Sequence, residues 1–328
     1  MEDGSLLHCL PLSMQPDCIK VFPSEYQVDA LEGTLVAAAY QYDEDTKLRT
    51  GGIIAFNPCN KLNDIISGKE EEPEYRDSNY HIATKALNGV LSCSWIKNNK
   101  FCGVSCITAD LRVTTIRLDA EVCEDNQYNR ISMDIDDEIA LDNDSDAIGL
   151  SLVNYDVTGS ISSITSSNGY VYILENGVVK HKWSAHDMET WISAFQPGNP
   201  NVVITGSDDS TIKFFDLRES ITPLKTVSRF DRQLMQFDMR NLDLPVACAT
   251  LDCAVWYIDF MDGGFMNVAG CYDGAFVYHT SHIDAQYSLY KKFVPQNPLI
   301  YSVAHLELQK KTVNVCSDFY NKRILFWD

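Results

Sequence analysis

One short unit recurs along this chain of 328 residues and limits the folds open to it. The unit is a strand of alternating polar and apolar residues, a tight turn that contains Asp or Asn, and a second alternating strand. Its clear copies are TADLRVTTIRLD from Thr108, SNGYVYILEN from Ser167, SDDSTIKFFD from Ser207, YDGAFVYH from Tyr272 and FYNKRILFWD from Phe319. Alternation with period two predicts half-buried β-strands, and a recurring unit buries its apolar face by stacking on its neighbours.

The spacing of the turns indicates the size of the repeat. The turn residues Asp110, Asn168, Asp209, Asp273 and Asn321 are separated by 58, 41, 64 and 48 positions. A WD unit repeats every 40 to 45 residues or so, which makes 41 one unit and 58 one unit with an insertion. The sequence therefore predicts an all-β fold, a WD40-type β-propeller that forms a single domain over residues 1–328.

The less regular N-terminal part of the chain and its C-terminal end supply further strands of the predicted propeller. LVAAAYQY (35–42) and GGIIAFN (51–57) predict a first blade, and VLSCSWI (90–96) begins the second after a polar loop over 61–79. The last strands, up to Trp327, are expected to pair with the N-terminal strand, so that no sheet edge stays open.

The interval of 64 residues is too long for one unit and too short for two. LMQFDMR (234–240) and PVACATLD (245–252) predict the inner two strands of a fifth blade, yet AVWYIDF (254–260) already predicts the first strand of the next. We expect about seven blades with the fifth truncated. The sequence leaves open whether this blade is short by nature or a segment has been lost.

An acidic insertion lies at about 119–146, where eleven Asp and Glu side chains face a single Arg130. Such a run repels itself, so we expect a solvated loop between two blades, with an electrostatic arm for a basic partner as the alternative.

The net charge narrows the possible partners, and the cysteine content indicates the redox state of the thiols. The formal net charge of −20 and the pI near 4.6 argue against direct binding to nucleic acid, which needs clustered Lys and Arg, and favour a cationic partner. Eleven Cys residues without a regular framework indicate reduced thiols. The N-terminus lacks the pattern of a signal peptide, and no apolar run reaches the length of a membrane span. We expect a cytoplasmic monomer.

Standard catalytic motifs are absent from the sequence. It contains no G-x-S-x-G, no H-E-x-x-H, no paired C-x-x-C and no phosphate-binding glycine loop. Cys102 and Cys106 are interpreted as core thiols, and neither a metal nor a cofactor is expected.

A His in a polar loop and an Asp in the following turn are typical of a WD blade, where they hold the turn together. His186 and Asp209 occupy these positions, with Thr205 or Ser207 as the hydroxyl partner, and Asp273 has the same structural place in a later turn. For His186 and Asp209 this role is favoured over catalysis.

Aromatic residues gather at positions expected on one rim of the central channel. Asp208, Tyr272 and Tyr320 precede the turns, whereas Trp191, Trp256 and Tyr301 lie at the starts of inner strands. One interpretation is that these rings wedge between blades. The other is an aromatic cage with Glu189 and Asp208 nearby, because ring faces attract a quaternary ammonium by about 0.5 to 2 kcal/mol each.

Several segments resemble the WD-repeat diphthine methylesterases, which are also called diphthine methyltransferases after their pathway. They are SAHDMETWISAF from Ser184, SDDSTIKFFD from Ser207, AVWYIDF from Ala254 and CSDFYNKRILFWD from Cys316. LVAAAYQY resembles the family's first blade, and the most specific part is A-H-x-x-E-x-W-I-x-A-F (185–195). The chain departs from the pattern at Asn321, where the family has Asp, and in its short fifth blade.

The resemblance implies an esterase of diphthamide biosynthesis. Its reaction is the hydrolysis of the methyl ester of methylated diphthine on translation elongation factor two, which releases methanol, and diphthine carries a trimethylammonium group.

We assign hypothetical roles to the rim residues. Trp191, Trp256 and Tyr301 hold the ammonium group, with Tyr272 beside them. Glu189 or Asp208 activates water with help from His186. Tyr320 or backbone N–H groups stabilise the oxyanion.

The alternatives are a non-catalytic adaptor, for instance in membrane trafficking, and a reader of methylated lysine. Only an esterase would turn over the methylated factor, whereas an adaptor or a reader would bind without turnover.

Overall fold

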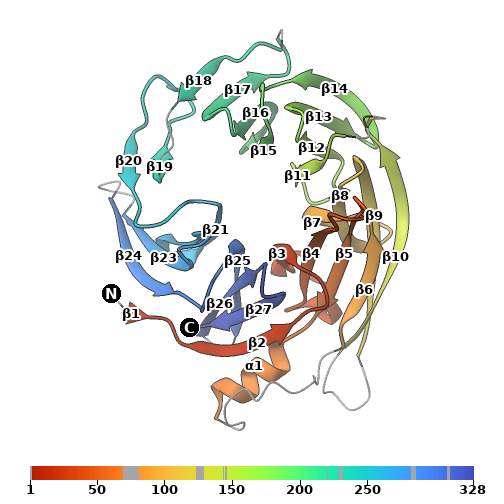
Figure 1. Ribbon diagram of the computed structural model, residues 1–328, viewed down its shortest axis with the longest axis vertical. Helices are drawn as coiled ribbons and strands as arrows, with labels where there is room; N and C mark the ends of the chain where they lie inside the picture. The colour runs from red at the N-terminus through yellow and green to blue at the C-terminus, as the bar shows by residue number, and fades with distance from the viewer. Residues whose placement is uncertain are drawn as a thin grey trace.

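The computed structural model describes residues 2–68, 81–122, 129–142, 144, 146–219, 221–228, 232–281, 286–308 and 311–328. Six sheets of four or five strands and one sheet of two strands form a ring (Figure 1). Each large sheet has one end strand toward the centre of the ring and its other strands farther out. The predicted all-β propeller is therefore confirmed, with six blades in the described part of the chain.

The first three blades follow the chain in order. The first contains β3 (Pro16–Val21), β4 (Leu35–Tyr42), β5 (Arg49–Phe56) and β6 (Ala83–Leu87). The second contains β7 (Val90–Lys97), β8 (Cys102–Thr108), β9 (Arg112–Val122) and β10 (Asn129–Ala140). The third contains β11 (Gly149–Asn154), β12 (Ile161–Ser166), β13 (Tyr170–Glu175) and β14 (Val178–Ser184).

Three further blades complete the ring. One contains β15 (Thr190–Gln196), β16 (Asn199–Ser207), β17 (Thr211–Asp216) and β18 (Lys225–Ser228). Another contains β21 (Tyr257–Met261), β22 (Phe265–Ala269), β23 (Ala275–Ser281) and β24 (Gln286–Phe293), with β1 (Glu2–Asp3) added at its edge. The last contains β25 (Ile300–Leu308), β26 (Lys311–Asp318), β27 (Arg323–Trp327) and β2 (Leu6–Pro11).

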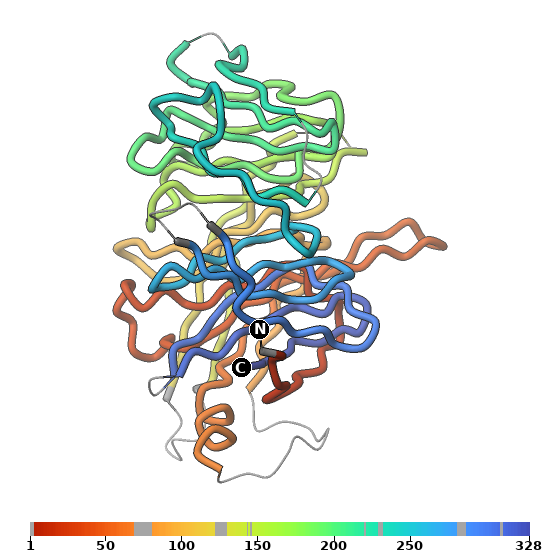
Figure 2. Tube along the Cα trace, turned by 90° about the vertical axis from the view of Figure 1, so that its left-hand side faces the viewer, coloured from red at the N-terminus to blue at the C-terminus, as the bar shows by residue number. Residues whose placement is uncertain are grey.

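Short helices connect some of these strands. They are α1 (Cys59–Ile66) and the 3-10 turns η1 (Ser24–Tyr26), η2 (Asp29–Leu31) and η3 (Asp262–Gly264). Figures 1 and 2 show α1 outside the ring, beyond β2. The helix corrects the predicted loop over 61–79, because Lys61–Ile66 is helical. The segment 69–80 lies outside the described residues.

The two ends of the chain close the ring. β2 pairs antiparallel with β27 as the outer strand of the last blade, as the sequence predicts, and β1 pairs parallel with β24. The Trp327 ring is fully buried and stacks on Phe293, with 5.3 Å between centroids and 12° between planes. The edge of β27 is therefore covered by a strand from the opposite end of the chain.

Every predicted turn residue lies between the second and third strand of its sheet. The next residue has a left-handed backbone in each case: Leu111 (φ 56°), Gly169 (83°), Ser210 (60°), Gly274 (111°) and Lys322 (50°). Asp and Asn are well suited to the position before such a residue, because their side chains form hydrogen bonds to the local backbone and hold the turn.

Hydrophobic cores lie mainly between neighbouring blades. One core joins the first two blades, and within it Phe22 meets Trp95 edge to face with 5.1 Å between centroids. Each large apolar side chain buried in this way contributes about 1.5 to 3 kcal/mol. Adjacent blades thereby hold their inner strands, and the residues at the strand starts, in fixed relative positions.

The acidic insertion is a hairpin of outer strands in its described part, so the predicted loop is wrong there. β9 ends at Val122, and β10 pairs with it over Asn129–Ala140. Ile131 is buried and Met133 half-buried against the core of the first two blades, while the neighbouring acidic side chains face solvent. Apolar residues alternate with the acids, and this alternation supports a strand despite the charge.

The sheet of two strands contains β19 (Gln233–Gln236) and β20 (Ala247–Thr250). Figure 1 draws it at the outer margin of the ring, and β20 contacts the outer strand β24. Its apolar side chains Leu234 and Ala249 pack against the core of the β21–β24 blade, so the predicted inner position is wrong. That the sheet is a truncated fifth of seven blades stays a prediction.

Candidate functional site

The predicted rim aromatics form one continuous array. The Trp191 and Trp256 rings lie 5.7 Å apart between centroids at an angle of 57°, and Trp256 stacks on Tyr301 at 4.8 Å and 29°. Tyr301 contacts Phe319 at 5.1 Å, and Phe319 contacts Tyr320 at 5.8 Å. We call these five residues the aromatic array; they come from three different blades.

Tyr272 joins the array through Tyr320. The side chains of the two tyrosines form a hydrogen bond, which raises the pKa of Tyr272, and both residues are well exposed. Their turns are brought together because the backbones of Cys271 and Ile300 exchange hydrogen bonds of 3.0 and 3.1 Å between blades. The two phenol groups thus form the solvent-facing end of the array.

The two predicted carboxylates lie on the β15–β18 blade. Glu189 immediately precedes β15, and Asp208 lies in the turn after β16, where its backbone N–H donates to the carbonyl of Glu189 at 3.2 Å. Asp208 is exposed and Glu189 half-buried. Trp191 follows Glu189 by two positions, so both carboxylates belong to the blade that supplies one end of the array.

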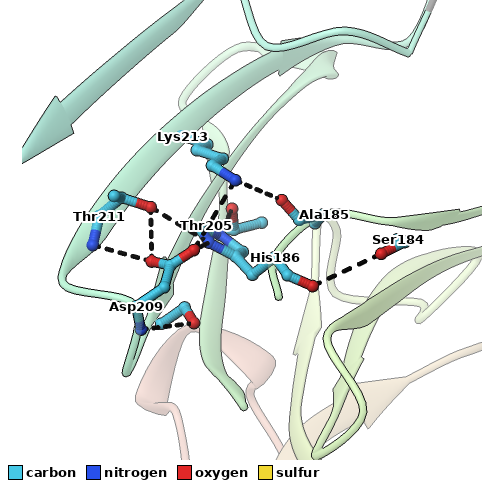
Figure 3. Close-up of polar contacts among 8 residues, drawn as sticks. Ser184, Ala185, His186, Thr205, Asp209, Thr211 and Lys213 are labelled. Carbon is cyan, nitrogen blue, oxygen red and sulfur yellow. Dashed lines mark hydrogen bonds and ion pairs between the residues drawn. The ribbon is translucent and has the colours of Figure 1, made fainter. Parts of the chain in front are cut away.

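His186 is buried in a hydrogen-bond network of its own blade, shown in Figure 3. Nδ1 contacts Asp209 Oδ2 and Nε2 contacts Thr205 Oγ1, each at 2.7 Å. Burial lowers the pKa of His186 and outweighs the hydrogen bond to Asp209. A neutral ring therefore donates from Nδ1 to Asp209 and accepts from Thr205 at Nε2.

Asp209 completes this network. Its Oδ1 accepts from the hydroxyl and the backbone N–H of Thr211 at 2.6 and 2.9 Å. Burial opposes ionisation of Asp209, but the hydrogen bonds from Thr211 and His186 outweigh it and lower the pKa. With both ring nitrogens of His186 engaged inside the blade, the geometry favours the role of holding the turn, and assistance to catalysis stays a prediction.

Asp273 has the position expected of a structural turn residue. Its Oδ2 accepts from the backbone N–H of Ala254 at 3.0 Å, and its own N–H donates to the Gly270 carbonyl. This bond fixes the segment that leads to Trp256.

Three features of the array and of the inner strands were missed in the sequence. Phe319 bridges Tyr301 and Tyr320, and its adjacency to Tyr320 in the repeat was the available signal. Asp17 lies in the inner strand β3, next to the strand β25 that carries Tyr301. His305 and Asp259 form an ion pair of 2.6 Å between β25 and β21, and hydrogen bonding to Asp259 raises the pKa of His305. No local pattern marks the last two, because they depend on which strands become neighbours.

Across the part of the chain that the structure describes, no three His, Cys, Asp or Glu side chains are grouped as a metal site would require. None of its described helices is both long and apolar enough to span a membrane.

Comparisons with known proteins find several similar proteins that carry the same name. No model of a protein family matches this chain. A Schizosaccharomyces pombe protein named diphthine methyltransferase is 23% identical over 214 residues, which cover 56% of this chain and 65% of that protein. A Dictyostelium discoideum protein named diphthine methyltransferase homolog is 22% identical over 286 residues, 73% of this chain and 76% of that protein. The human diphthine methyltransferase is 28% identical over 98 residues, 23% of this chain and 22% of that protein.

A solved structure supports the fold alone. One chain in a crystal structure of a mitotic checkpoint complex superposes on 96% of this chain and 92% of its own length, with a TM-score of 0.61 and 11% identity.

These matches agree with the motifs on which the resemblance rests. The resemblance inferred from the sequence is confirmed: the chain is a distant relative of the proteins named diphthine methyltransferase.

Proposed function

We propose that this protein hydrolyses the methyl ester of methylated diphthine on translation elongation factor two during diphthamide biosynthesis. The observation that carries the proposal is the aromatic array, in which Trp191, Trp256 and Tyr301 make direct ring contacts across blades. The names of the relatives support the same pathway and favour it over a non-catalytic adaptor.

The array suits a quaternary ammonium group. Such a cation has no N–H to donate, so ring faces and nearby carboxylates are what attract it. Trp191 and Trp256 meet at 57° and form two walls of a corner, and Trp256 is 44% exposed. Each ring face contributes about 0.5 to 2 kcal/mol of cation–π attraction.

A truncated fifth blade would explain why these two indoles meet. Trp191 precedes the two-stranded sheet in sequence and Trp256 follows it, and the sheet lies at the outer margin of the ring.

Hydrolysis requires a water molecule to add to the ester carbonyl and methanol to leave. Glu189 or Asp208 accepts a proton from the attacking water, and the hydroxyl of Tyr320 donates to the oxyanion. The proton passes to the leaving methoxide, methanol departs, and the new carboxylic acid loses its remaining proton to solvent to give diphthine. The exposure of Tyr320 at the solvent-facing end of the array supports this assignment.

The acidic surface fits a cationic site on a protein partner better than nucleic acid. The net charge of −20 would attract a basic region of the elongation factor, and such attraction acts mainly on the rate of association. We propose that the protein acts in the cytoplasm as a monomer.

Methanol release from elongation factor carrying methylated diphthine tests the proposal. We expect turnover by the wild type and a loss of about 100-fold in kcat for Glu189→Gln or Asp208→Asn, whichever is the base. His186→Gln completes the series. Full activity in all three variants would remove these residues from the mechanism, and binding of the factor without methanol release by the wild type would favour the adaptor.

A further inference from the structure

An acidic residue that the sequence did not single out lies beside the aromatic array. Asp17 is in the inner strand β3, and its neighbour β25 carries Tyr301 at its start. The hydroxyl of Ser317 accepts from the backbone N–H of Ser302 at 3.0 Å and donates to the carbonyl of Asp17 at 3.4 Å. One hydroxyl thus links the backbone of Asp17 to the residue that follows Tyr301.

A second contact fixes the same register. The backbone N–H of Ile19 donates to Ser302 Oγ at 3.0 Å. Asp17 and Tyr301 therefore lie at the same level of two adjacent inner strands, although they are near opposite ends of the chain.

The carboxyl group of Asp17 has no hydrogen bond or ion pair to any other side chain in residues 2–68, 81–122 or the later described segments. Burial raises its pKa, and the neighbouring thiol of Cys18 adds to the shift. The pKa of the Tyr301 hydroxyl is also raised, first by burial and then by the charge of Asp17. A carboxyl group in this position lacks a cation to neutralise it.

The other charged groups near Asp17 are already engaged. On its own strand, the Lys20 ammonium bonds to the Tyr257 hydroxyl and lies 4.4 Å from the centroid of that ring. The Cys18 thiol pairs with Cys93 of β7, and the hydrogen bond from Cys93 lowers the pKa of Cys18 to about 6. Tyr301 is the titratable group that faces Asp17 from β25.

Two other carboxylates of the described inner strands, Asp259 and Glu307, lie farther away. Asp259 is committed to His305, and His305 lies four residues beyond Tyr301 along β25, roughly 13 Å at the rise of a strand. A residue that serves an ammonium group bound by the aromatic array must be close to the array itself.

We propose that Asp17 is the carboxylate that neutralises the quaternary ammonium group at the aromatic array, and that it gives up its proton to solvent when the cation binds. The assignment rests on the proposed function and adds to it the residue that recognises the charge of the substrate. Exposed Asp208 would contribute less, because water screens its charge.

Two small probes isolate the charge of the ligand. Choline carries the trimethylammonium group, and 3,3-dimethyl-1-butanol has the same shape without the charge. We would measure the affinity of each by calorimetry with wild type, Asp17→Asn and Asp17→Glu at pH values from 5 to 8, in buffers of different ionisation enthalpy. Asp134→Asn is the matched control, since it removes one negative charge from the outer strand β10, where the side chain is exposed.

The expected results have a definite sign. A protonated Asp17 is neutral, so choline should bind the wild type more tightly as the pH rises, with release of a proton while Asp17 is still protonated in the free protein. Asp17→Asn should bind choline about tenfold more weakly than the wild type and without this pH dependence. Asp17→Glu should retain much of the affinity and much of the pH dependence. The neutral probe should bind the wild type and both variants equally. Choline binding by Asp17→Asn equal to that of the wild type, or none by the wild type, would overturn the assignment.

Choline binding can be measured without turnover, so this experiment tests the role of Asp17 separately from the proposed esterase activity. If methanol is released from the methylated factor while Asp17→Asn binds choline normally, the inference about Asp17 fails and the esterase stands. If choline binds as expected and no methanol is released, the site recognises a quaternary ammonium without the proposed hydrolysis.

Discussion

The indole ring of Trp256 stacks on the phenol ring of Tyr301, with 4.8 Å between their centroids and 29° between their planes. The stack covers one face of each ring and joins the β21–β24 blade to the β25–β27 blade. It leaves Trp256 44% exposed, with the Trp191 ring 5.7 Å away between centroids. Trp256 therefore lies between Trp191 and Tyr301 in the array and contacts both rings.

Replacing Trp256 by Ala should lower kcat/KM for the methylated factor by about tenfold, because a cation–π contact of about 1 to 2 kcal/mol is lost. Trp256→Phe should retain most of the activity. Phe260→Ala is the matched control, since Phe260 lies four residues after Trp256, in the inner strand β21, and is 75% exposed. Equal losses in Trp256→Ala and Phe260→Ala would contradict a specific role for the array.

His186→Ala should act on stability rather than on the chemical step. The change leaves the turn around Asp209 without its partner and opens a buried space, so we expect the free energy of unfolding to fall by about 2 to 4 kcal/mol. Chemical denaturation measures this, and kcat of the folded variant at low temperature should stay within about threefold. A stable variant with a large loss of kcat would instead support the predicted catalytic assistance.

The contribution of His186 to stability should also depend on pH. Burial lowers the pKa of His186 below 6.5, so the unfolded chain binds a proton more readily than the folded protein. The contribution of His186 to stability is present above pH 6.5 and is lost as the pH falls below it. The difference in unfolding free energy between wild type and His186→Ala should therefore shrink between pH 7 and pH 5.

The contribution of His305 to stability should depend on pH in the opposite sense. Hydrogen bonding to Asp259 raises its pKa above 6.5, so its stabilisation is complete below pH 6.5 and is lost as the pH rises through the folded value. Both side chains are about a quarter exposed. We expect His305→Gln to cost about 1 kcal/mol at pH 5.5 and less at pH 9, by denaturation with urea at both pH values. A cost that does not change with pH would show that the pair is not ionic.

The local signals in the sequence predicted the strands and turns well. Alternation placed β4 over Leu35–Tyr42, and each predicted turn residue is followed by a left-handed backbone residue. Turns of this kind depend on a few neighbouring residues, so their chemistry can be recognised without the rest of the fold. The rim aromatics were predicted for the same reason, because their positions count from the turns.

Features that depend on distant segments were missed. The charge of the acidic insertion hid the alternation of Ile131 and Met133, which becomes meaningful only when a neighbouring core is there to bury them. The outer position of β19 and β20 depends on packing against another blade. Asp17 becomes part of the site only because closure of the ring sets β3 beside β25.

Gly169→Ala should destabilise the protein through the junction between two blades. The carbonyl of Gly169 accepts from the N–H groups of Ala185 and His186 at 2.9 and 3.2 Å, and an added Cβ would lie 2.1 Å from the carbonyl oxygen of His186. The left-handed backbone, with φ of 83°, costs an alanine about 1 to 2 kcal/mol by itself.

Gly198→Ala separates these two effects. Its φ of 75° imposes a similar backbone cost, but an added Cβ would meet no atom within 4 Å. Thermal and urea unfolding should therefore show a larger loss for Gly169→Ala than for Gly198→Ala, and the difference measures the clash with the loop that carries His186. Equal losses would mean that this loop moves aside freely, and the position of His186 would then not depend on the neighbouring turn.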